Sequence, residues 1–508
     1  MPGCYSGNMR VLFSFRSRHF RGRAFLLGTV VLGVLLASGP RCALGQTSPP
    51  ALSPAGNPDR LPMTTSSPVA AKLFEEGLQL RYDFHIEEAL GKFREASRKD
   101  PNFAQAWVYI VMLASDPVEA KQAVQKAQLA SQNVTPAEKL LVKWMISTSE
   151  GRFLDAIAAM NDLMAMYPRD AQLNYEAGLW LQSQGNYEGA ATFTKHALEV
   201  APNFAGALNT LAYDLALMHE YDQSVLYLKR YAEAEANDPN PRDSWAEILR
   251  EAGRLEESLA EYREALKLDP KFYSSQLGIG NDYALLGKQD HAREEYAKAL
   301  AMALTPQDKL DCQIQSAVTY AREDNVKQAR GELAAVLAEA TKLQLNDYRS
   351  IVHQDLALLA ESPAAAFRHL DEAEAVLQGP GQVSGAGRSR LLARTLLMRT
   401  RLAAEAGKLE MARAAVSRLQ KMVQTSRSYT IERAYHGANG ALLAAEKKTG
   451  AAIEELREDP DAPFSMVKLA ELQAASGDAH DAEGTRARLK ADYGIELEDW
   501  LVVRKFRQ

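Results

Sequence analysis

Between Pro136 and Leu304, small, large and turn-forming residues recur every 34 positions along the chain. One position of the period holds Gly in four of five units, a position five further on holds only Ala or Ser, and one seven beyond that holds Leu, Ala or Tyr. The three sets are Gly151, Gly185, His219, Gly253 and Gly287; Ala156, Ala190, Ser224, Ser258 and Ala292; and Leu163, Ala197, Tyr231, Ala265 and Ala299. Self-similarity at a fixed period near 34 predicts a stack of helical hairpins.

Each residue type suits a different part of such a hairpin. Gly enters left-handed backbone conformations without steric cost, so it fits the turn between the two helices. The small residue five positions later lets the two helices approach closely. Pro168, Pro202 and Pro270 close three of the five units, and Pro cannot continue a helix. The predicted unit is therefore helix, turn, helix and stop.

Segments such as GNYEGAATFTKHALEVAPN (185–203) and GRLEESLAEYREALKLDPKF (253–272) resemble tetratricopeptide (TPR) repeats in several positions and in register. The resemblance implies a right-handed superhelix whose concave groove is lined by the first helix of each hairpin. It also implies a groove that binds a protein or peptide. Carried over by register, the groove residues are Tyr175, Asn209, Tyr213, Asp243, Glu247, Arg250 and Asn281.

Acidic residues stand at two of these groove positions. Chaperone-binding members of the family hold a C-terminal carboxylate with Lys and Arg, whereas this chain has Asp243 and Glu247 there. The resemblance therefore disfavours a carboxylate ligand and implies a basic or neutral partner segment. Tyr and Arg are also favoured at the centres of protein interfaces.

The helical pattern extends over most of the chain and predicts an all-α solenoid of about eleven or twelve TPR-like hairpins. We expect an N-terminal array over 69–304 with its regular core at 136–304, followed by divergent hairpins over 305–378. The run GPGQVSGAG (379–387) predicts a loop or hinge. Further hairpins then fill 388–508, and the unrepeated tail from 491 is expected to cap the last apolar face.

The first 45 residues read as a targeting segment. Five Arg precede an apolar run, Ala24 to Ala37, and Asp and Glu are absent. Ala43-Leu44-Gly45 places small residues where a signal peptidase reads, so we expect cleavage before Gln46 and a periplasmic or secreted protein. An uncleaved membrane anchor and an organelle transit peptide remain alternatives. The lipoprotein interpretation of Cys42 is weak because Arg41 precedes it.

Residues 46–68 contain six Pro among Ser, Thr and Ala, and predict a disordered linker. The whole chain has 59 basic and 65 acidic residues, a net charge of −6. Six Arg lie in residues 1–45, so the chain from Gln46 on keeps 53 basic residues and a net charge of −12. This balance argues against nucleic-acid binding, which depends on neutralising phosphates.

No motif in the sequence points to catalysis, and we expect no cofactor and no metal site. There is no GxxxxGK[ST] loop, HExxH pair or GxSxG elbow. Gly278 and Gly280 lie within a predicted helix and are expected to serve packing. His291 and Glu295 have i, i+4 spacing, but two ligands do not make a metal site. Cys312 has no partner cysteine and is expected to be buried.

These observations favour a non-enzymatic, exported protein-interaction scaffold that binds a partner in its groove. Two other functions remain open, a structural or assembly subunit of a cell-envelope complex and an accessory subunit of an enzyme on another chain. An RNA-binding array of the pentatricopeptide kind is rejected, because its period is 35 and its ligand is anionic.

Overall fold

A computed structural model describes residues 59–507 apart from 115, 382, 384, 427 and 461, and within this part every regular element is a helix. The expected signal peptide (1–45) and the first part of the expected linker lie outside the described residues. No described helix is long and apolar enough to span a bilayer. The prediction of an all-α fold is confirmed.

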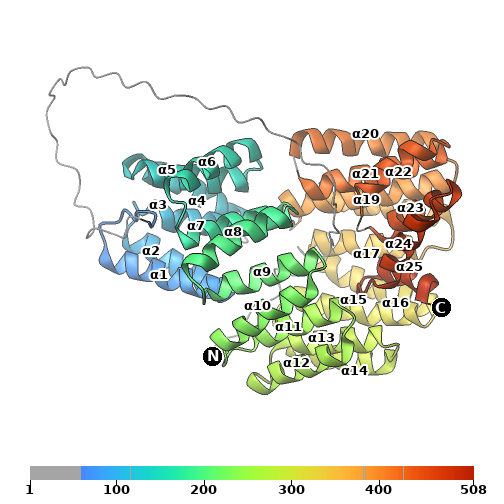
Figure 1. Cartoon of the computed structure of the whole chain (residues 1–508), viewed down its shortest axis with the longest axis horizontal. Coiled ribbons are helices and arrows are strands. Elements are labelled where there is room, and N and C mark those ends of the chain that lie inside the picture. Colours follow the sequence, from blue (N-terminus) through green and yellow to red (C-terminus); the bar gives the residue numbers. More distant parts are fainter. Residues whose placement is uncertain are drawn as a thin grey trace.

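Twelve helical hairpins and one final helix follow one another along the described chain (Figure 1). The first three are α1 (Pro68–Tyr82), α2 (Ile86–Lys99), α3 (Ala104–Leu113), α4 (Pro117–Ala130), α5 (Pro136–Ser149) and α6 (Phe153–Met166), with a short 3₁₀ helix, η2 (Ser131–Asn133), after α4. The next four are α7 (Ala171–Ser183), α8 (Tyr187–Val200), α9 (Ala205–Leu217), α10 (Tyr221–Ala234), α11 (Asn240–Glu251), α12 (Leu255–Leu268), α13 (Tyr273–Leu285) and α14 (Gln289–Met302).

The remaining helices vary in length from 9 to 21 residues. They are α15 (Pro306–Arg322), α16 (Val326–Lys342), α17 (Asn346–Leu358), α18 (Pro363–Gln378), α19 (Gly385–Glu405), α20 (Leu409–Ser426), α21 (Tyr429–Ala445), α22 (Thr449–Arg457), α23 (Pro463–Ala475), α24 (Ala479–Lys490) and the final α25 (Leu497–Arg507). Each helix packs against its hairpin partner, and from α7 to α15 the odd-numbered helices also touch one another. The odd-numbered helices therefore form the inner layer of the superhelix.

The turn residues of the 34-residue period adopt the backbone conformation that the period predicts. Gly151, Gly185, Gly253 and Gly287 have φ between 73° and 80°. His219, which replaces Gly in the middle unit, also has a positive φ, 61°. A side chain in the left-handed region is strained, so only the constraint of the flanking helices keeps His219 there.

Small residues at the second repeat position join the two helices of a hairpin directly. Ser224 Oγ donates to the carbonyl of Ala212, and Ser258 Oγ donates to the carbonyl of Ala246, each at 2.7 Å. A larger side chain at either position would push the two helices apart. In α13, Gly280 packs under the ring of Tyr296, where a Cβ atom would clash with it. Gly280 therefore allows α13 and α14 to pack closely.

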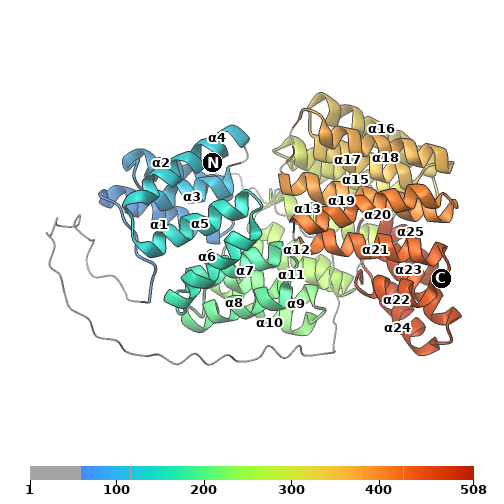
Figure 2. The ribbon, with the colours of Figure 1, turned by 90° about the horizontal axis from the view of Figure 1, so that it is seen from above.

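The expected loop 379–387 is shorter in the structure, because α19 already begins at Gly385. Asn346 Nδ2 donates to the carbonyls of Val376 at 2.8 Å and Pro380 at 3.0 Å, and so ties the connection to the start of α17. Helix α19 then packs against both α17 and α18. Figure 2 shows the result from above, with the early and late hairpins on opposite sides of α9–α14.

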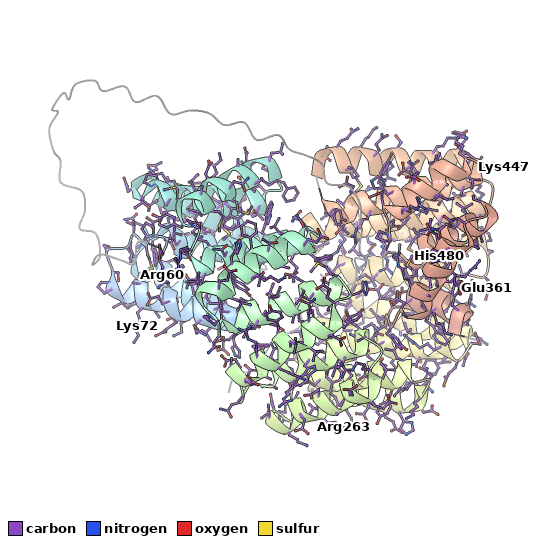
Figure 3. All side chains as sticks on the ribbon, viewed as in Figure 1. Arg60, Lys72, Arg263, Glu361, Lys447 and His480 are labelled. Carbon is purple, nitrogen blue, oxygen red and sulfur yellow. The ribbon has the colours of Figure 1, made fainter. Side chains whose placement is uncertain are left out.

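The expected linker needs a correction, because its last residues are bound to the solenoid. Residues 59–67, which we call the N-terminal strap, run in extended form along the starts of α3, α5 and α7. Leu61 N donates to Asp170 Oδ2 at 2.7 Å, and Thr64 N and Oγ1 donate to Glu138 at 2.7 and 2.6 Å. Arg60 in Figure 3 marks where the strap begins.

Candidate functional site

The structure buries most of the residues that the repeat register assigns to a binding groove. Tyr175, Asn209, Asp243, Arg250 and Asn281 are each 5% exposed or less. Tyr213 and Glu247 are half-buried. The expectation that this set forms an open binding surface is therefore corrected, since a partner could not reach five of the seven side chains.

Interactions inside the solenoid engage many of their polar atoms, although Asn209 Oδ1 and Arg250 Nε are buried without a hydrogen-bond partner. Tyr213 Oη donates to Glu247 Oε2 at 2.7 Å, and Arg250 Nη2 donates to Glu247 Oε1 at 3.2 Å, so the structure brings these three together between α9 and α11. Burial beside this carboxylate raises the pKa of Tyr213 well above its usual value. The group acts as an internal link between successive repeats.

The other buried members bind neighbouring helices. Asp243 accepts a hydrogen bond from Ser275 Oγ at 2.8 Å, and Asn281 Oδ1 accepts one from Tyr296 Oη at 2.9 Å. Both bonds join helices of adjacent or paired units. These positions therefore set the repeat geometry.

The end of the first hairpin helix covers the inner face at Tyr175. The ring of Tyr82, the last residue of α1, lies 5.4 Å from the ring of Tyr175 and 4.8 Å from that of Phe204. Beside it Arg81 Nη2 donates to Glu176 Oε2 at 2.8 Å. Burial raises the pKa of Glu176, and Arg81 opposes that rise. The superhelix is wound tightly enough for its first turn to fill the groove of later ones.

The last residues of the described chain cover the inner face further along. Arg322 Nη2 of α15 donates to the carbonyl of Ile495 at 3.1 Å and lies over the Trp500 ring at 5.3 Å. Arg394 of α19 lies 2.8 Å from Glu496 and 3.4 Å from Glu498. Here too the chain fills its own concave surface.

An open cleft of about 790 Å³ remains between α6–α8 and the helices α21 and α22. Figure 1 shows the ends of α7 and α8 facing the start of α21. We call this space the inter-arm cleft, with α1–α8 as the N-terminal arm and α19–α24 as the C-terminal arm. Its lining is Phe153, Ile157, Met160, Asn161, Trp180, Leu181, Gln184, Gly185, Asn186, Tyr187, Glu188, Gly189, Phe193, Met218, Tyr429, Glu432, Arg433, Arg457, Glu458 and Pro460.

The cleft opens where two successive hairpins are spaced widely. The backbones of α6 and α7 approach each other less closely than those of α8 and α9, and large side chains such as Met160 and Trp180 fill the space between them. Helix α6, FLDAIAAMNDLMAM, is apolar on more than its buried side. Leu154 is 69% exposed and Ile157 is 38% exposed. Of these two residues only Ile157 lines the cleft, and it gives this wall an apolar, solvent-accessible side chain.

An aromatic residue of the opposite wall, Tyr429, contacts the N-terminal arm. Tyr429, at the start of α21, lies with its ring 2.7 Å from where a Cβ atom of Gly185 would be. Arg433 stacks over this ring at 4.2 Å and donates to Tyr429 Oη at 3.1 Å. A second contact of this kind places Tyr493 on Gly253. Both glycines are hairpin turns of the 34-residue period, so turns of the regular repeats receive rings from the last part of the chain.

The rim of the cleft carries more negative than positive charge. Glu188, Glu432 and Glu458 are exposed and form no ion pair with a described residue. The two basic residues of the lining are engaged, because Arg433 stacks on a tyrosine and Arg457 lies 3.1 Å from Asp481. Three carboxylates are thus available to a bound cation.

Sequence reasoning missed this cleft because its walls lie far apart in the chain. Nothing in the repeat register relates Phe153 to Tyr429. One local signal exists, since the second helix of a buried hairpin should be polar on its outer side. The exposed Leu154, Ile157 and Met166 of α6 break this rule. An exposed apolar group at helical spacing marks a surface that contacts something else.

No candidate for catalysis or metal binding stands out among the described residues. No group of three or more metal-binding side chains occurs in this part. Cys312 is buried, and burial raises its pKa to about 12, which opposes thiolate chemistry. His291 is exposed against Tyr283, and Glu295 lies 2.8 Å from Lys298.

Comparison with known proteins supports the repeat assignment. Residues 246–272 match the family model described as tetratricopeptide repeat. Superkiller protein 3 of Schizosaccharomyces pombe is 24% identical over 261 residues, which cover 49% of this chain but only 18% of that protein. The chain thus spans under a fifth of the curated relative that it matches.

Solved structures of repeat proteins resemble parts of the fold. A thermophilic TPR protein of Thermus thermophilus has a TM-score of 0.31 at 24% identity, covering 36% of this chain and 96% of that one. The Cut9–Hcn1 hetero-tetramer of APC/C has a TM-score of 0.38 at 16% identity, covering 79% of this chain and 76% of that one.

Proposed function

From the premise that this chain is a tetratricopeptide-repeat protein, we propose that it is a protein-interaction scaffold whose partner binds in the inter-arm cleft. The observation that carries the proposal is the exposure of apolar side chains, Ile157 and Tyr429 among them, on both walls of a 790 Å³ space. Clefts that bind small ligands have volumes of roughly 300–1,000 Å³, so this space is large enough to receive side chains of a partner. A partner that covers these apolar side chains removes them from water, which favours binding.

The partner segment in this proposal is basic or neutral. Glu188, Glu432 and Glu458 surround the opening, and an acidic segment would add repulsion at the rim. The proposed role is recognition without catalysis. The proposed binding surface is the space between the two arms, and not the inner face of the repeats that the register predicts.

We also propose that the protein is exported, with its first 45 residues removed as a signal peptide. Support comes from the sequence of that segment, in which basic residues precede a short apolar run and small residues precede Gln46. A partner in the cell envelope or outside the cell follows from this proposal.

Affinity capture from the native source tests the scaffold function. We expect the native chain to retain a partner that the variant Ile157→Ser/Tyr429→Ala loses and that Leu226→Ser, a change at a 60% exposed residue of α10, keeps. A partner retained equally by all three chains would refute binding in the cleft. It would favour an assembly subunit with its interface elsewhere.

A further inference from the structure

We infer that the inter-arm cleft recognises an amphipathic, basic α-helix of a partner protein, with large apolar residues on the buried side and Lys or Arg on the other. This inference rests on the proposed scaffold function and specifies the partner of the same site. Four observations carry it: the chemistry of the cleft floor, the size of the cleft, the mostly helical walls and the position of the rim charges.

The floor of the cleft suits bulky, flexible apolar anchors. Met160 and Met218 line it together with aromatic residues such as Trp180 and Phe193. Unbranched methionine side chains adapt their shape to different partners, and aromatic rings bury large apolar areas. Leucine, isoleucine or phenylalanine side chains spaced one helical turn apart would fill such a floor.

The size of the cleft fits a short stretch of helix. An α-helix about 10 Å wide has a pitch of about 5.4 Å, so two turns occupy roughly 850 Å³. The cleft holds about 790 Å³. A partner would therefore place about two turns between the arms and extend beyond them on either side.

The walls offer few hydrogen-bond partners to an extended peptide. An extended segment needs such partners for its backbone. Much of the lining belongs to helices, and at the turn between α7 and α8 the N–H groups of Gly185, Asn186 and Gly189 already donate to acceptors within the chain. The N-terminal strap shows how this chain does bind an extended segment, because Gln105 Nε2 donates to the Pro62 carbonyl at 2.7 Å while carboxylates accept the strap's N–H groups. A helix satisfies its own backbone and needs no such side chains.

The negative charges on the rim favour a partner helix whose solvent-facing side is positively charged. Glu188 lies on the N-terminal arm, whereas Glu432 and Glu458 lie on the C-terminal arm. A helix between the arms would thus have carboxylates on both sides. Lys and Arg side chains can lay their apolar stems along the walls and reach these carboxylates with their charged ends.

Binding of a designed probe to the full chain tests the inference. The probe is a peptide of about 18 residues, long enough to form a helix, with Leu on one face and Lys on the other. Its twin carries Glu in place of every Lys, and a third peptide carries Pro in place of one central Leu. We expect the Leu/Lys probe to bind and both other peptides to bind at least about tenfold more weakly.

Matched variants place that binding in the cleft. The triple change Glu188→Gln/Glu432→Gln/Glu458→Gln is expected to weaken the Leu/Lys probe about tenfold, because three exposed ion pairs together contribute an effect of that order. The control Glu88→Gln/Glu256→Gln/Glu294→Gln removes the same charge from exposed positions on α2, α12 and α14 and should change binding less than about twofold. Ile157→Ser removes an apolar wall contact and is expected to weaken the probe about tenfold.

Different outcomes refute different parts of the reasoning. Equal binding of the Leu/Lys and Leu/Glu probes, both weakened by Ile157→Ser, would leave the cleft as the binding site and overturn its preference for a basic helix. Undiminished binding of the proline peptide would overturn the helical form of the partner. Probe binding that neither Ile157→Ser nor the cleft triple variant changes would overturn the inference and the proposed cleft together.

Discussion

Tyrosine rings from the last part of the chain cover two hairpin turns, and replacing the glycines of these turns with alanine should loosen the late hairpins and open the inter-arm cleft. Gly185 lies under the ring of Tyr429, and Gly253 lies under the ring of Tyr493. Gly151 and Gly287 have similar positive φ values of 73° and 77°, but no atom lies within 4 Å of where their Cβ atoms would be. Gly151 and Gly287 therefore serve as control positions, at which alanine meets the same backbone conformation but displaces no ring.

The size of the effect follows from two terms. Alanine in the left-handed region costs about 1–2 kcal/mol, and this term is common to all four positions. At Gly185 the new methyl group also displaces the Tyr429 ring. If the ring loses about 60 Å² of apolar contact, the cost is about 1.5 kcal/mol at ~25 cal/mol/Å². With an equal term at Gly253, the double variant Gly185→Ala/Gly253→Ala should lose about 3 kcal/mol more than Gly151→Ala/Gly287→Ala, all of it from the two ring contacts.

A distance measurement between the arms separates closure from general destabilisation. Spin labels at cysteines introduced for Lys195 on α8 and Glu454 on α22, both exposed, report the separation in a chain whose three native cysteines are replaced by Ser. We expect the distance distribution to broaden and lengthen for Gly185→Ala/Gly253→Ala and to stay unchanged for Gly151→Ala/Gly287→Ala. Equal broadening in both variants, or none in either, would refute the role of the two ring contacts.

Three further predictions concern the buried carboxylates and the first residues of the chain. Burial raises the pKa of Asp214 well above its usual value, so the folded chain holds this proton more tightly than the unfolded chain and stability falls as pH rises from about 4. Asp214→Asn, which can keep the bond to Gln182, should therefore raise the melting temperature at about pH 8 and leave it nearly unchanged at about pH 4; a rise of equal size at both values would contradict this. Glu138→Ala leaves the Thr64 donors of the strap without their acceptor and should cost about 2–3 kcal/mol in chemical denaturation, with faster proteolysis before residue 68; unchanged proteolysis would show that the carboxylate does not hold the strap. The intact mass of the protein from its native source should correspond to a chain that begins at Gln46, and a mass that includes residues 1–45 would argue against cleavage.

Much of the fold could be predicted from the sequence because the repeat period reflects local physics. The glycines at 151, 185, 253 and 287 enter the left-handed turns, and the small Ser224 and Ser258 contact their hairpin partners as expected. These are interactions within one hairpin, and the sequence of one hairpin specifies them.

The repeat register does not predict contacts between hairpins that are far apart in the sequence, because these contacts depend on how the superhelix winds. Arg81 meets Glu176 and Arg322 meets the Ile495 carbonyl only because the superhelix curves back on itself. The positions that line a groove in an open solenoid are therefore covered in this one. The strap escaped detection for a similar reason, since a segment rich in Pro, Ser and Thr shows no apolar period and its partners lie far away in the sequence.

The strap also constrains the order in which the chain can fold during its synthesis. Leu61 and its acceptor Asp170 are separated by 109 residues. At roughly 5–20 residues per second, the ribosome needs about 5 to 20 s to make that stretch. During this interval Leu61 lacks its Asp170 acceptor, whereas the Asp100 acceptor of Thr65 and Ser66, at the end of α2, is made much earlier. The strap therefore attaches in steps, and its first residues join the fold only when the fourth hairpin emerges.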